Sequence, residues 1–427
     1  MMKLASPGFA ISYWQRNSWP NGDKTNSWAE FGPKIAAAGP VLAQLQSVWS
    51  KPRYDDGFDY ATGMVDFPSM PLLICSKQSA MLFSAAIADD LSRAKPEEAL
   101  NHLCSLLAVV KDLGDQPLII SQLVRVACAS YAFNATWEAL HATDLTDAQL
   151  REMQTAWETN EFCTTMVKSL EMERALTLDY FRQIRGSRDL ELKQLAEEEE
   201  ITDAFRDAFN YNGLPTHGFI LRDLHLPVWR IAWAAQDELR SLARWEPFIK
   251  GGRVAESNSW LDAKNFFPGF DPYSISYLPF PATTREKLGW YDRCRFLFSE
   301  QPFSINGVII LKVNKIETQR NMAITAIALK RYELRHGKKP ETLSALIPEF
   351  LAAVPIDRMD GKPLRYHLNS DGTFKLYSVG VNGTDEGGDP QPEKSGVDSI
   401  HDLWQGKDAL WPRQVEESND SAGASRL

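Results

Sequence analysis

Apolar residues recur at helical spacing through much of the chain between about residues 71 and 250. The stretch from Pro96 to Gly114 shows this most clearly, because a proline and two acidic residues occupy its first turn and a glycine ends it. A second periodic run of similar length follows at 118–141. These two runs predict a helical hairpin, and the chain as a whole predicts a mainly α fold with a body of packed helical hairpins.

Several other segments carry helical signals. Thr146 opens the motif TDAQ, which places Gln149 at the spacing of a capping box. Apolar periodicity predicts further helices at 33–50, 159–185, 226–248 and 306–336, and Gly337 stands where the last of these should end. The segment 340–351, led by Pro340, is predicted to form one more short helix.

Alternation with a period of two appears only near the C-terminus. The runs DGKPLRYHL and TFKLYSVG are joined by NSDG, which predicts an antiparallel β-hairpin. The expected organisation is an irregular N-terminal segment with one helix (1–70), a helical body (71–303) with an aromatic-rich loop at 250–285, a small α+β module (304–412), and a disordered polar tail (413–427).

Three consecutive motifs follow the predicted long helix near the C-terminus: HGKKPETLSALIPEFL, VPIDRMDGKPLRYHL and DGTFKLYSVGVNGTDEGG. Their order resembles the soluble domain of the major pseudopilin of type II secretion systems, over about residues 315–411. The whole chain also resembles a group of large bacterial proteins, without a defined activity, that join a helical body to such a module. The stretch GDQPLIISQLVRVA carries that second resemblance.

The pseudopilin resemblance implies a structural calcium site, because in that family the loop after the last strand binds calcium. Calcium takes about six to eight oxygen ligands, and glycines allow backbone carbonyls to turn inward. By position, Asn382 corresponds to the first aspartate ligand of the family, and Asp398 and Asp408 compete for the later one. Asp385 and Asp389 are further candidates within the loop. The alternative is a solvated turn that binds nothing.

One departure from the family changes the expected role of the module. Pseudopilins assemble through an apolar helix at the start of the chain, whereas here the equivalent helix is internal and the polar run 314–320 interrupts it. The apolar stretch at its beginning is too short to form the spine of a fibre. We therefore expect a reused interaction or capping module and exclude a pilus subunit.

Composition narrows the classes of partner. The formal net charge of −10 disfavours nucleic acid, because an acidic chain repels phosphate backbones. The five cysteines form no CxxC motif and stand mostly in apolar contexts that predict buried thiols. No apolar run approaches the length of a transmembrane segment, and the first residues lack the apolar region of a signal peptide. The family resemblance nevertheless suggests the cell envelope or periplasm.

Known catalytic motifs are missing: the sequence contains no HExxH, GxSxG, Walker A or GxGxxG. Glu171 and Arg174, together with the aromatic residues Trp260 and Tyr273, are the candidates for a ligand groove on the helical body. We expect a non-enzymatic binding or structural protein with a protein or peptide partner. Two alternatives stay open: a hydrolytic enzyme that uses carboxylates of the body, and a glycan-binding protein that uses the aromatic residues at 260–280.

Overall fold

A computed structural model describes residues 28–51, 60, 71–141, 145–186, 226–268, 289–299, 307–393 and 403–411. Among the expected site residues, Tyr273 and Asp398 lie outside the described residues. Residues 269–285 of the aromatic-rich loop and the polar tail at 413–427 lie outside them as well.

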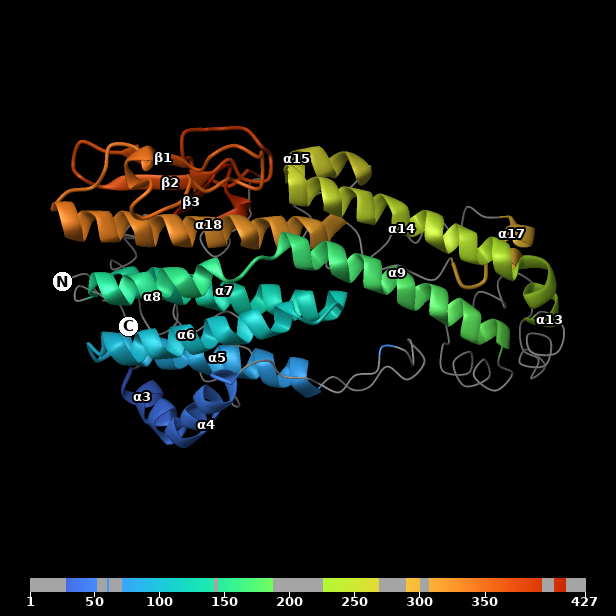
Figure 1. Cartoon of the computed structure of the whole chain (residues 1–427), viewed down its shortest axis with the longest axis horizontal. Coiled ribbons are helices and arrows are strands. Elements are labelled where there is room, and N and C mark those ends of the chain that lie inside the picture. The colour runs from blue at the N-terminus through green and yellow to red at the C-terminus, as the bar shows by residue number, and fades with distance from the viewer. Residues whose placement is uncertain are drawn as a thin grey trace, which may run out of the picture.

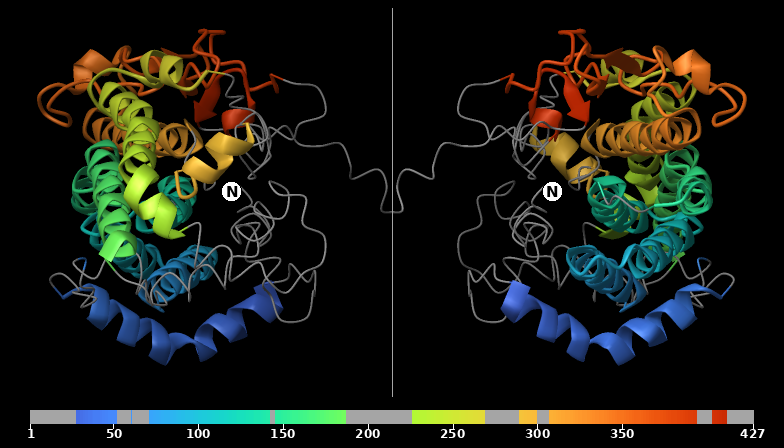
Figure 2. Two further views of the ribbon diagram at one scale, coloured as in Figure 1. Left: turned by 90° about the vertical axis from the view of Figure 1, so that its right-hand side faces the viewer. Right: turned by 90° about the vertical axis from the view of Figure 1, so that its left-hand side faces the viewer.

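The helices stack in layers beneath a small sheet (Figure 1). Below the sheet lie α18, then α7 with α8, then α6 with α5, and finally α3 with α4. The helices α9 and α14 pack against each other and extend beyond one end of this stack. Viewed along the long axis, the layers curve into an arc that runs from α3 and α4 to the sheet (Figure 2).

The described helical elements have the following bounds: α3 Trp28–Ala37, α4 Gly39–Trp49, α5 Pro71–Ser92, α6 Pro96–Gly114, α7 Ile119–His141, α8 Asp147–Glu158, α9 Cys163–Gly186, α13 Leu226–Val228, the π-helical turn η3 Trp229–Trp233, α14 Ala234–Ser257, α15 Trp260–Ala263, the 3-10 turn η4 Lys264–Phe266, α17 Trp290–Arg295, α18 Gly307–His336, and the 3-10 turns η5 Leu343–Leu346 and η6 Leu403–Gln405.

Local signals explain where several helices begin and end. The hairpin α6–α7 and the start of α6 at Pro96 are confirmed. At α8, Thr146 accepts a hydrogen bond from the backbone N–H of Gln149, whose side chain accepts one from the backbone N–H of Thr146, so the capping box is confirmed. Gly337 follows α18 with a φ of +69°, the left-handed conformation in which glycine commonly ends a helix.

The long helix α18 is buried on all sides up to its last turn, which is exposed, because the sheet covers one face and α7 and α8 cover the other. Its polar run at 314–320 does not interrupt it. Glu317 is only 3% exposed, and its Oε2 accepts a hydrogen bond of 2.7 Å from the N–H of Phe162, just before α9. Arg320 donates to the carbonyls of Trp157 and Glu158 at the end of α8, at 3.0 and 2.8 Å. The polar run therefore satisfies the free backbone groups at the corner between α8 and α9.

The three-stranded antiparallel sheet contains β1 (Arg365–Leu368), β2 (Phe374–Ser378) and β3 (Ala409–Trp411), in the order β1-β2-β3. Tyr366 pairs with Leu376 across the predicted hairpin, and Leu376 pairs with Trp411 on its other side. The NSDG turn forms as predicted, with the Gly372 N–H donating to the Asn369 carbonyl at 3.0 Å. The strand β3 was not predicted.

A single hydrophobic cluster joins the helical layers to the sheet. It includes Leu106 of α6, Phe133 of α7, Ile327 of α18 and Leu376 of β2, so it continues across the predicted domain boundary at residue 304. The mainly α fold with a small C-terminal α+β part is confirmed. Among the described helices, none combines the length and apolar character that crossing a membrane requires.

Four local features differ from the sequence-based expectations. Residues 28–49 form two helices rather than one, with a break at Ala38 before a helix that has a proline in its first turn. The helix α14 continues to Ser257, beyond the predicted start of the aromatic-rich loop. The short helix predicted at 340–351 is reduced to η5, because Pro348 has no N–H to continue a helix. Of the five cysteines, Cys75 is exposed and Cys104 is half-buried, whereas the other three are buried as expected.

Candidate functional site

The glycine-rich stretch after β2, residues 380–393, is a closely packed loop, which we call the acidic loop. Gly380, Gly383, Gly387 and Gly388 all have φ between +67° and +76°, a region that side chains disfavour. A Cβ on Gly380 would overlap the backbone carbonyl oxygen of Lys407, and one on Gly383 would overlap the side chain of Leu261 in α15. The glycines at these two positions are therefore required both by conformation and by close approach.

The side chain of Asp408 lies at the centre of the acidic loop. Its Oδ2 accepts hydrogen bonds from three backbone N–H groups, of Glu386, Gly388 and Asp389, at 3.1, 2.7 and 3.1 Å. The residue is only 1% exposed, and its second oxygen, Oδ1, is buried without a hydrogen-bond partner. A buried carboxylate oxygen without a partner is unusual in a folded protein and invites a ligand.

Glu386 presents a second carboxylate oxygen of the same kind. Its Oε1 accepts a hydrogen bond of 3.1 Å from the Asn382 amide, whereas its Oε2 is buried and unpartnered. Burial raises the pKa of Glu386, and the charge of Asp408 raises it further. Burial also raises the pKa of Asp408, despite its three backbone donors. Because both pKa values are raised, a positive charge next to these two carboxylates would stabilise their ionised forms.

The other predicted metal ligands have partners within the protein. Asp385 accepts from the Tyr377 hydroxyl at 3.0 Å and from the Gly387 N–H at 3.1 Å. Asp389 forms an ion pair of 2.8 Å with Lys407, which lowers its pKa.

The amide of Asn382 lies between two acidic side chains. Its nitrogen donates to Glu386 at 3.1 Å and to Glu393 at 3.3 Å, and its oxygen accepts from the Thr384 N–H at 2.9 Å. The asparagine therefore supplies part of the compensation that a cation would give to these two carboxylates.

The side-chain donors of the acidic loop match a cation site only in part. Within the described part of the chain, no group of three or more acidic, histidine or cysteine side chains converges well enough to hold a metal ion. The unpartnered oxygens of Asp408 and Glu386 are nevertheless hard carboxylate donors of the type that calcium prefers. Among the predicted ligands, Asp408 fits such a site best, and Glu386 is a donor that the sequence analysis missed.

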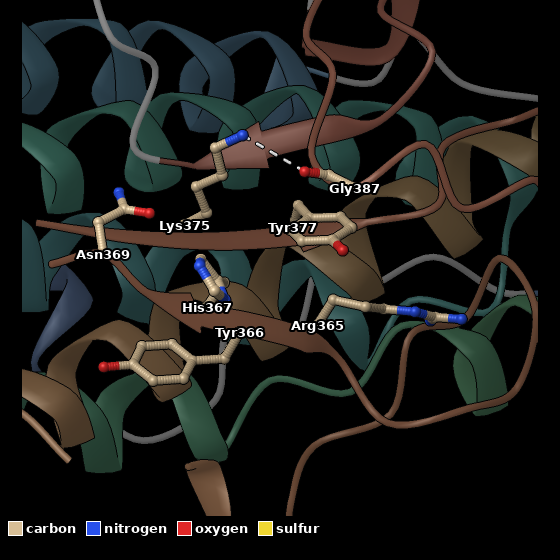
Figure 3. A pocket seen from close by; sticks show the side chains of 7 residues that line it. All are labelled: Arg365, Tyr366, His367, Asn369, Lys375, Tyr377 and Gly387. Atoms are coloured by element: carbon tan, nitrogen blue, oxygen red, sulfur yellow. Dashed lines mark hydrogen bonds between the residues drawn. The ribbon is translucent and has the colours of Figure 1, made fainter. Parts of the chain in front are cut away.

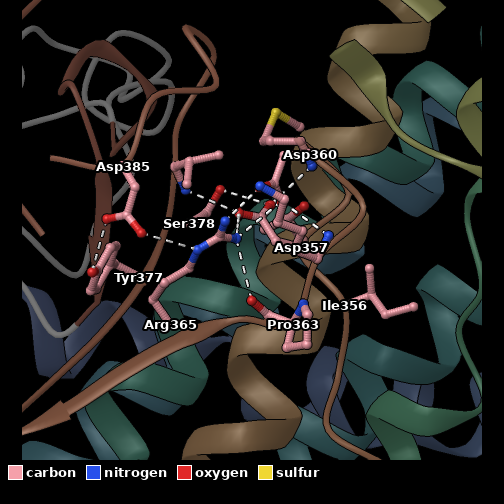
Figure 4. Close-up of polar contacts among 12 residues, drawn as sticks. Ile356, Asp357, Asp360, Pro363, Arg365, Tyr377, Ser378 and Asp385 are labelled. Atoms are coloured by element: carbon pink, nitrogen blue, oxygen red, sulfur yellow. Dashed lines mark hydrogen bonds and ion pairs between the residues drawn. The ribbon is translucent and has the colours of Figure 1, made fainter. Parts of the chain in front are cut away.

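A second acidic cluster fixes the start of the acidic loop (Figure 4). Asp357 is fully buried and accepts hydrogen bonds from the N–H of Met359 and Val379 and from the Ser378 hydroxyl. Arg365 forms ion pairs with Asp357 at 3.2 Å, with Asp360, and with Asp385 of the acidic loop at 3.5 Å. This network joins the turn after α18, the hairpin and the acidic loop.

Burial raises the pKa of Asp357 to about 6, because desolvation outweighs its hydrogen bonds. The folded state therefore binds this proton more tightly than the unfolded state. The group's contribution to stability is complete below about pH 4 and is lost as the pH rises through 6.

We expect the unfolding free energy of the wild type, relative to Asp357→Asn, to fall by roughly 2–3 kcal/mol between pH 4 and pH 7. The asparagine variant lacks the titrating group, so its unfolding free energy does not show this part of the dependence on pH. Urea denaturation of both proteins in EGTA at several pH values measures the difference. Parallel pH profiles would rule out a raised pKa at Asp357.

The outer face of the β1–β2 hairpin carries an open, shallow hollow (Figure 3). Two cations line it, but both have partners: Arg365 in the carboxylate network, and Lys375 at the carbonyls of Gly387 and Gly388, at 3.3 and 3.4 Å. His367 lies at the same surface. Because its cations already have protein partners, this hollow is a weaker candidate for a ligand site than the acidic loop.

The residues of the predicted ligand groove are distributed over two separate places. Glu171 and Arg174 on α9 form ion pairs with Arg253 and Glu246 on α14, so they link the two helices at the surface. Trp260 is only 1% exposed and stacks on Phe267, with ring planes inclined by 9°. The structure does not bring Trp260 together with the charged pair, and its buried ring serves packing.

The carboxylates of the body that the enzyme alternative would use also have structural contacts. Glu173 accepts a hydrogen bond of 3.2 Å from the N–H of Ile119, the first residue of α7, and so caps that helix. Burial raises its pKa. Asp179 accepts from Gln183 one turn further along α9.

Comparison with known proteins identified no relative: no family model matches the chain, and no curated protein and no solved structure matches it.

Proposed function

We propose that this chain is a non-enzymatic binding or structural protein of the cell envelope, in which the acidic loop takes up a structural calcium ion. The observation that carries the proposal is the pair of buried carboxylate oxygens, Asp408 Oδ1 and Glu386 Oε2, that have no hydrogen-bond partner among the described residues. A divalent cation would compensate both charges and would fix the loop against the rest of the module. The resemblance to pseudopilins supports calcium and an exported location.

Asp408 and Glu386 would supply the side-chain oxygens, and glycine-rich backbone would supply carbonyls. Asn382 lies next to Glu386 and also donates to Glu393, which adds a third carboxylate to the surroundings. Calcium sites of extracellular modules are commonly weak, with Kd of about 10⁻⁴–10⁻³ M. A site with one neutral amide in place of a carboxylate belongs in that range, where calcium outside the cytoplasm is sufficient to fill it.

No described contact favours the two alternatives to the same degree. Glu173 caps a helix, Glu171 forms an ion pair with Arg253, and Trp260 is buried in the core. A hydrolytic site requires two carboxylates that face a shared cavity, and a glycan site requires exposed rings. The acidic loop remains the best-supported functional feature.

The proposal predicts a calcium-specific rise in melting temperature. We expect millimolar calcium, compared with excess EGTA or with magnesium, to stabilise the wild type by roughly 0.4–1.4 kcal/mol, because millimolar calcium is about 1–10 times a Kd of 10⁻⁴–10⁻³ M. Asp408→Asn and Glu386→Gln should lose the effect, because each removes one charged donor. Asp371→Asn, in the exposed turn of the hairpin, is the matched control and should keep it.

Equilibrium dialysis measures calcium binding directly. It therefore distinguishes a variant that does not bind calcium from one that is only less stable. A wild type that binds no calcium, or an equal rise in melting temperature in all four proteins, would contradict the proposal.

A further inference from the structure

The chain that returns after the acidic loop, residues 403–411, contacts three parts of the molecule in sequence; we call it the return segment. Its first part pairs with the acidic loop through backbone hydrogen bonds. The N–H of Glu393 donates to the carbonyl of Gln405 at 3.0 Å, the N–H of Lys407 to the carbonyl of Gln391 at 2.9 Å, and the N–H of Asp408 to the carbonyl of Asp389 at 3.0 Å. The Asp408 side chain then accepts the three backbone hydrogen bonds at the centre of the loop. The return segment is therefore bonded to the acidic loop both through its backbone and through the side chain of Asp408.

The second part of the return segment is the strand β3, which is only three residues long. It pairs with β2 through Ala409, Leu410 and Trp411. All three residues are buried, so the strand is part of the core and not an exposed edge. A strand this short depends on the contacts at its two ends to keep its place.

The third part is Trp411, which contacts the helical body. Its ring lies 5.0 Å from the ring of Phe133 and 5.7 Å from that of Trp137, both on α7. Aromatic pairs at such distances contribute about 0.5–1.5 kcal/mol beyond area burial. Only two residues lie between Asp408 and Trp411, so the end of the loop and the packing on α7 are joined by one short extended segment.

The same loop touches the body at a second point. Gly383 lies directly against Leu261 of α15, with no room for a Cβ. Next to this contact, the N–H groups of Trp260 and Leu261 donate to the carbonyls of Arg358 and Met359, at 2.9 and 3.1 Å. The acidic loop is thus bounded by the body at α15 and, through the return segment, at α7.

We propose that the return segment couples cation binding in the acidic loop to the packing of Trp411 on α7, so that the loop and the helical body stabilise each other. This inference rests on the proposed calcium site. Without a cation, the like charges of Asp408 and Glu386 oppose closure of the loop where the return segment is attached. With a cation, the closed loop keeps β3 in place and presents Trp411 to Phe133 and Trp137.

Coupling of this kind is reciprocal: if calcium favours the packing of Trp411, then weaker packing must lower calcium affinity. Phe133→Leu tests this, because Phe133 lies on α7 and has no described contact with the acidic loop. Phe83→Leu on α5 is the matched control, since Phe83 is also buried and its ring lies beside His102 of α6 instead. Isothermal titration of the full chain with calcium chloride measures the affinity of each protein.

We expect Phe133→Leu to bind calcium at least about fivefold more weakly than the wild type, a coupling of ordinary size, and Phe83→Leu to bind as the wild type does. Trp411→Phe, which keeps an aromatic ring on β3, should lie between them. Equal affinity in Phe133→Leu and the wild type, or an equal loss in both phenylalanine variants, would overturn the coupling and leave the calcium site standing. A wild type that gives no calcium-binding signal would overturn both proposals together.

Discussion

Replacing Glu317 by alanine is expected to lower the free energy of unfolding by roughly 3–5 kcal/mol, the usual cost of leaving one half of a buried ion pair alone. The Glu317 side chain is 4% exposed and that of its partner Arg320 is 12% exposed, with 2.9 Å between their charged atoms. The substitution leaves the guanidinium without its carboxylate. It also leaves the N–H of Phe162, before α9, without its acceptor.

Glu333→Ala on the same helix is the matched control, because Glu333 forms a half-exposed ion pair with Lys339 at 3.0 Å. Exposed pairs of this type contribute up to about 1 kcal/mol. Chemical denaturation of both variants beside the wild type gives the comparison. Similar losses in the two variants would show that Glu317 does not fix the corner between α8 and α9.

The second large effect is expected at Gly380, where alanine should cost roughly 2–5 kcal/mol through backbone strain and overlap combined. The residue has a φ of +67°, and its missing side chain leaves space for the carbonyl oxygen of Lys407. An added Cβ would have to displace that backbone. The pairing of the acidic loop with residues 405–408 would then be disturbed.

Gly372→Ala separates the two causes. Gly372 has a φ of +82° in the hairpin turn, but nothing lies within 4 Å of the position of its Cβ. Alanine there should cost only the conformational part, about 1–2 kcal/mol. Melting curves in EGTA and in calcium give both values, and an equal cost at the two glycines would exclude the close approach at Gly380 as a cause of instability.

The elements with strong local signals could be predicted from the sequence. Pro96, Gly114 and the TDAQ motif act within one turn of the backbone, so they fixed the ends of helices without knowledge of the fold. The NSDG turn did the same for the hairpin. The mainly α class followed from these segments.

Contacts between distant segments could not be predicted in this way. The polar run of α18 has the composition of a solvated face, but Glu317 and Arg320 are directed at a corner that lies far away in the sequence. The strand β3 has three residues, too few for a recognisable alternation, and forms because β2 offers a free edge.

The candidate site was predicted in part. The resemblance indicated the loop and placed Asp398 and Asp408 in competition for one ligand position, with Asp385 and Asp389 as further candidates. Their side chains are occupied by Tyr377 and Lys407, which only the folded arrangement reveals. Glu386 was missed because nothing in the local sequence distinguishes it from the other acidic residues of this glycine-rich stretch.

The position of α18 also has a consequence for how the chain is made. Its neighbours α7 and α8 end at His141 and Glu158, whereas α18 begins only at Gly307. During synthesis the N-terminal helices leave the ribosome first, and their apolar faces stay open to water until α18 has emerged. Closure of the core over such a separation is slow. The nascent chain therefore passes through a long interval in which chaperone protection matters more than it does for a protein built from local contacts.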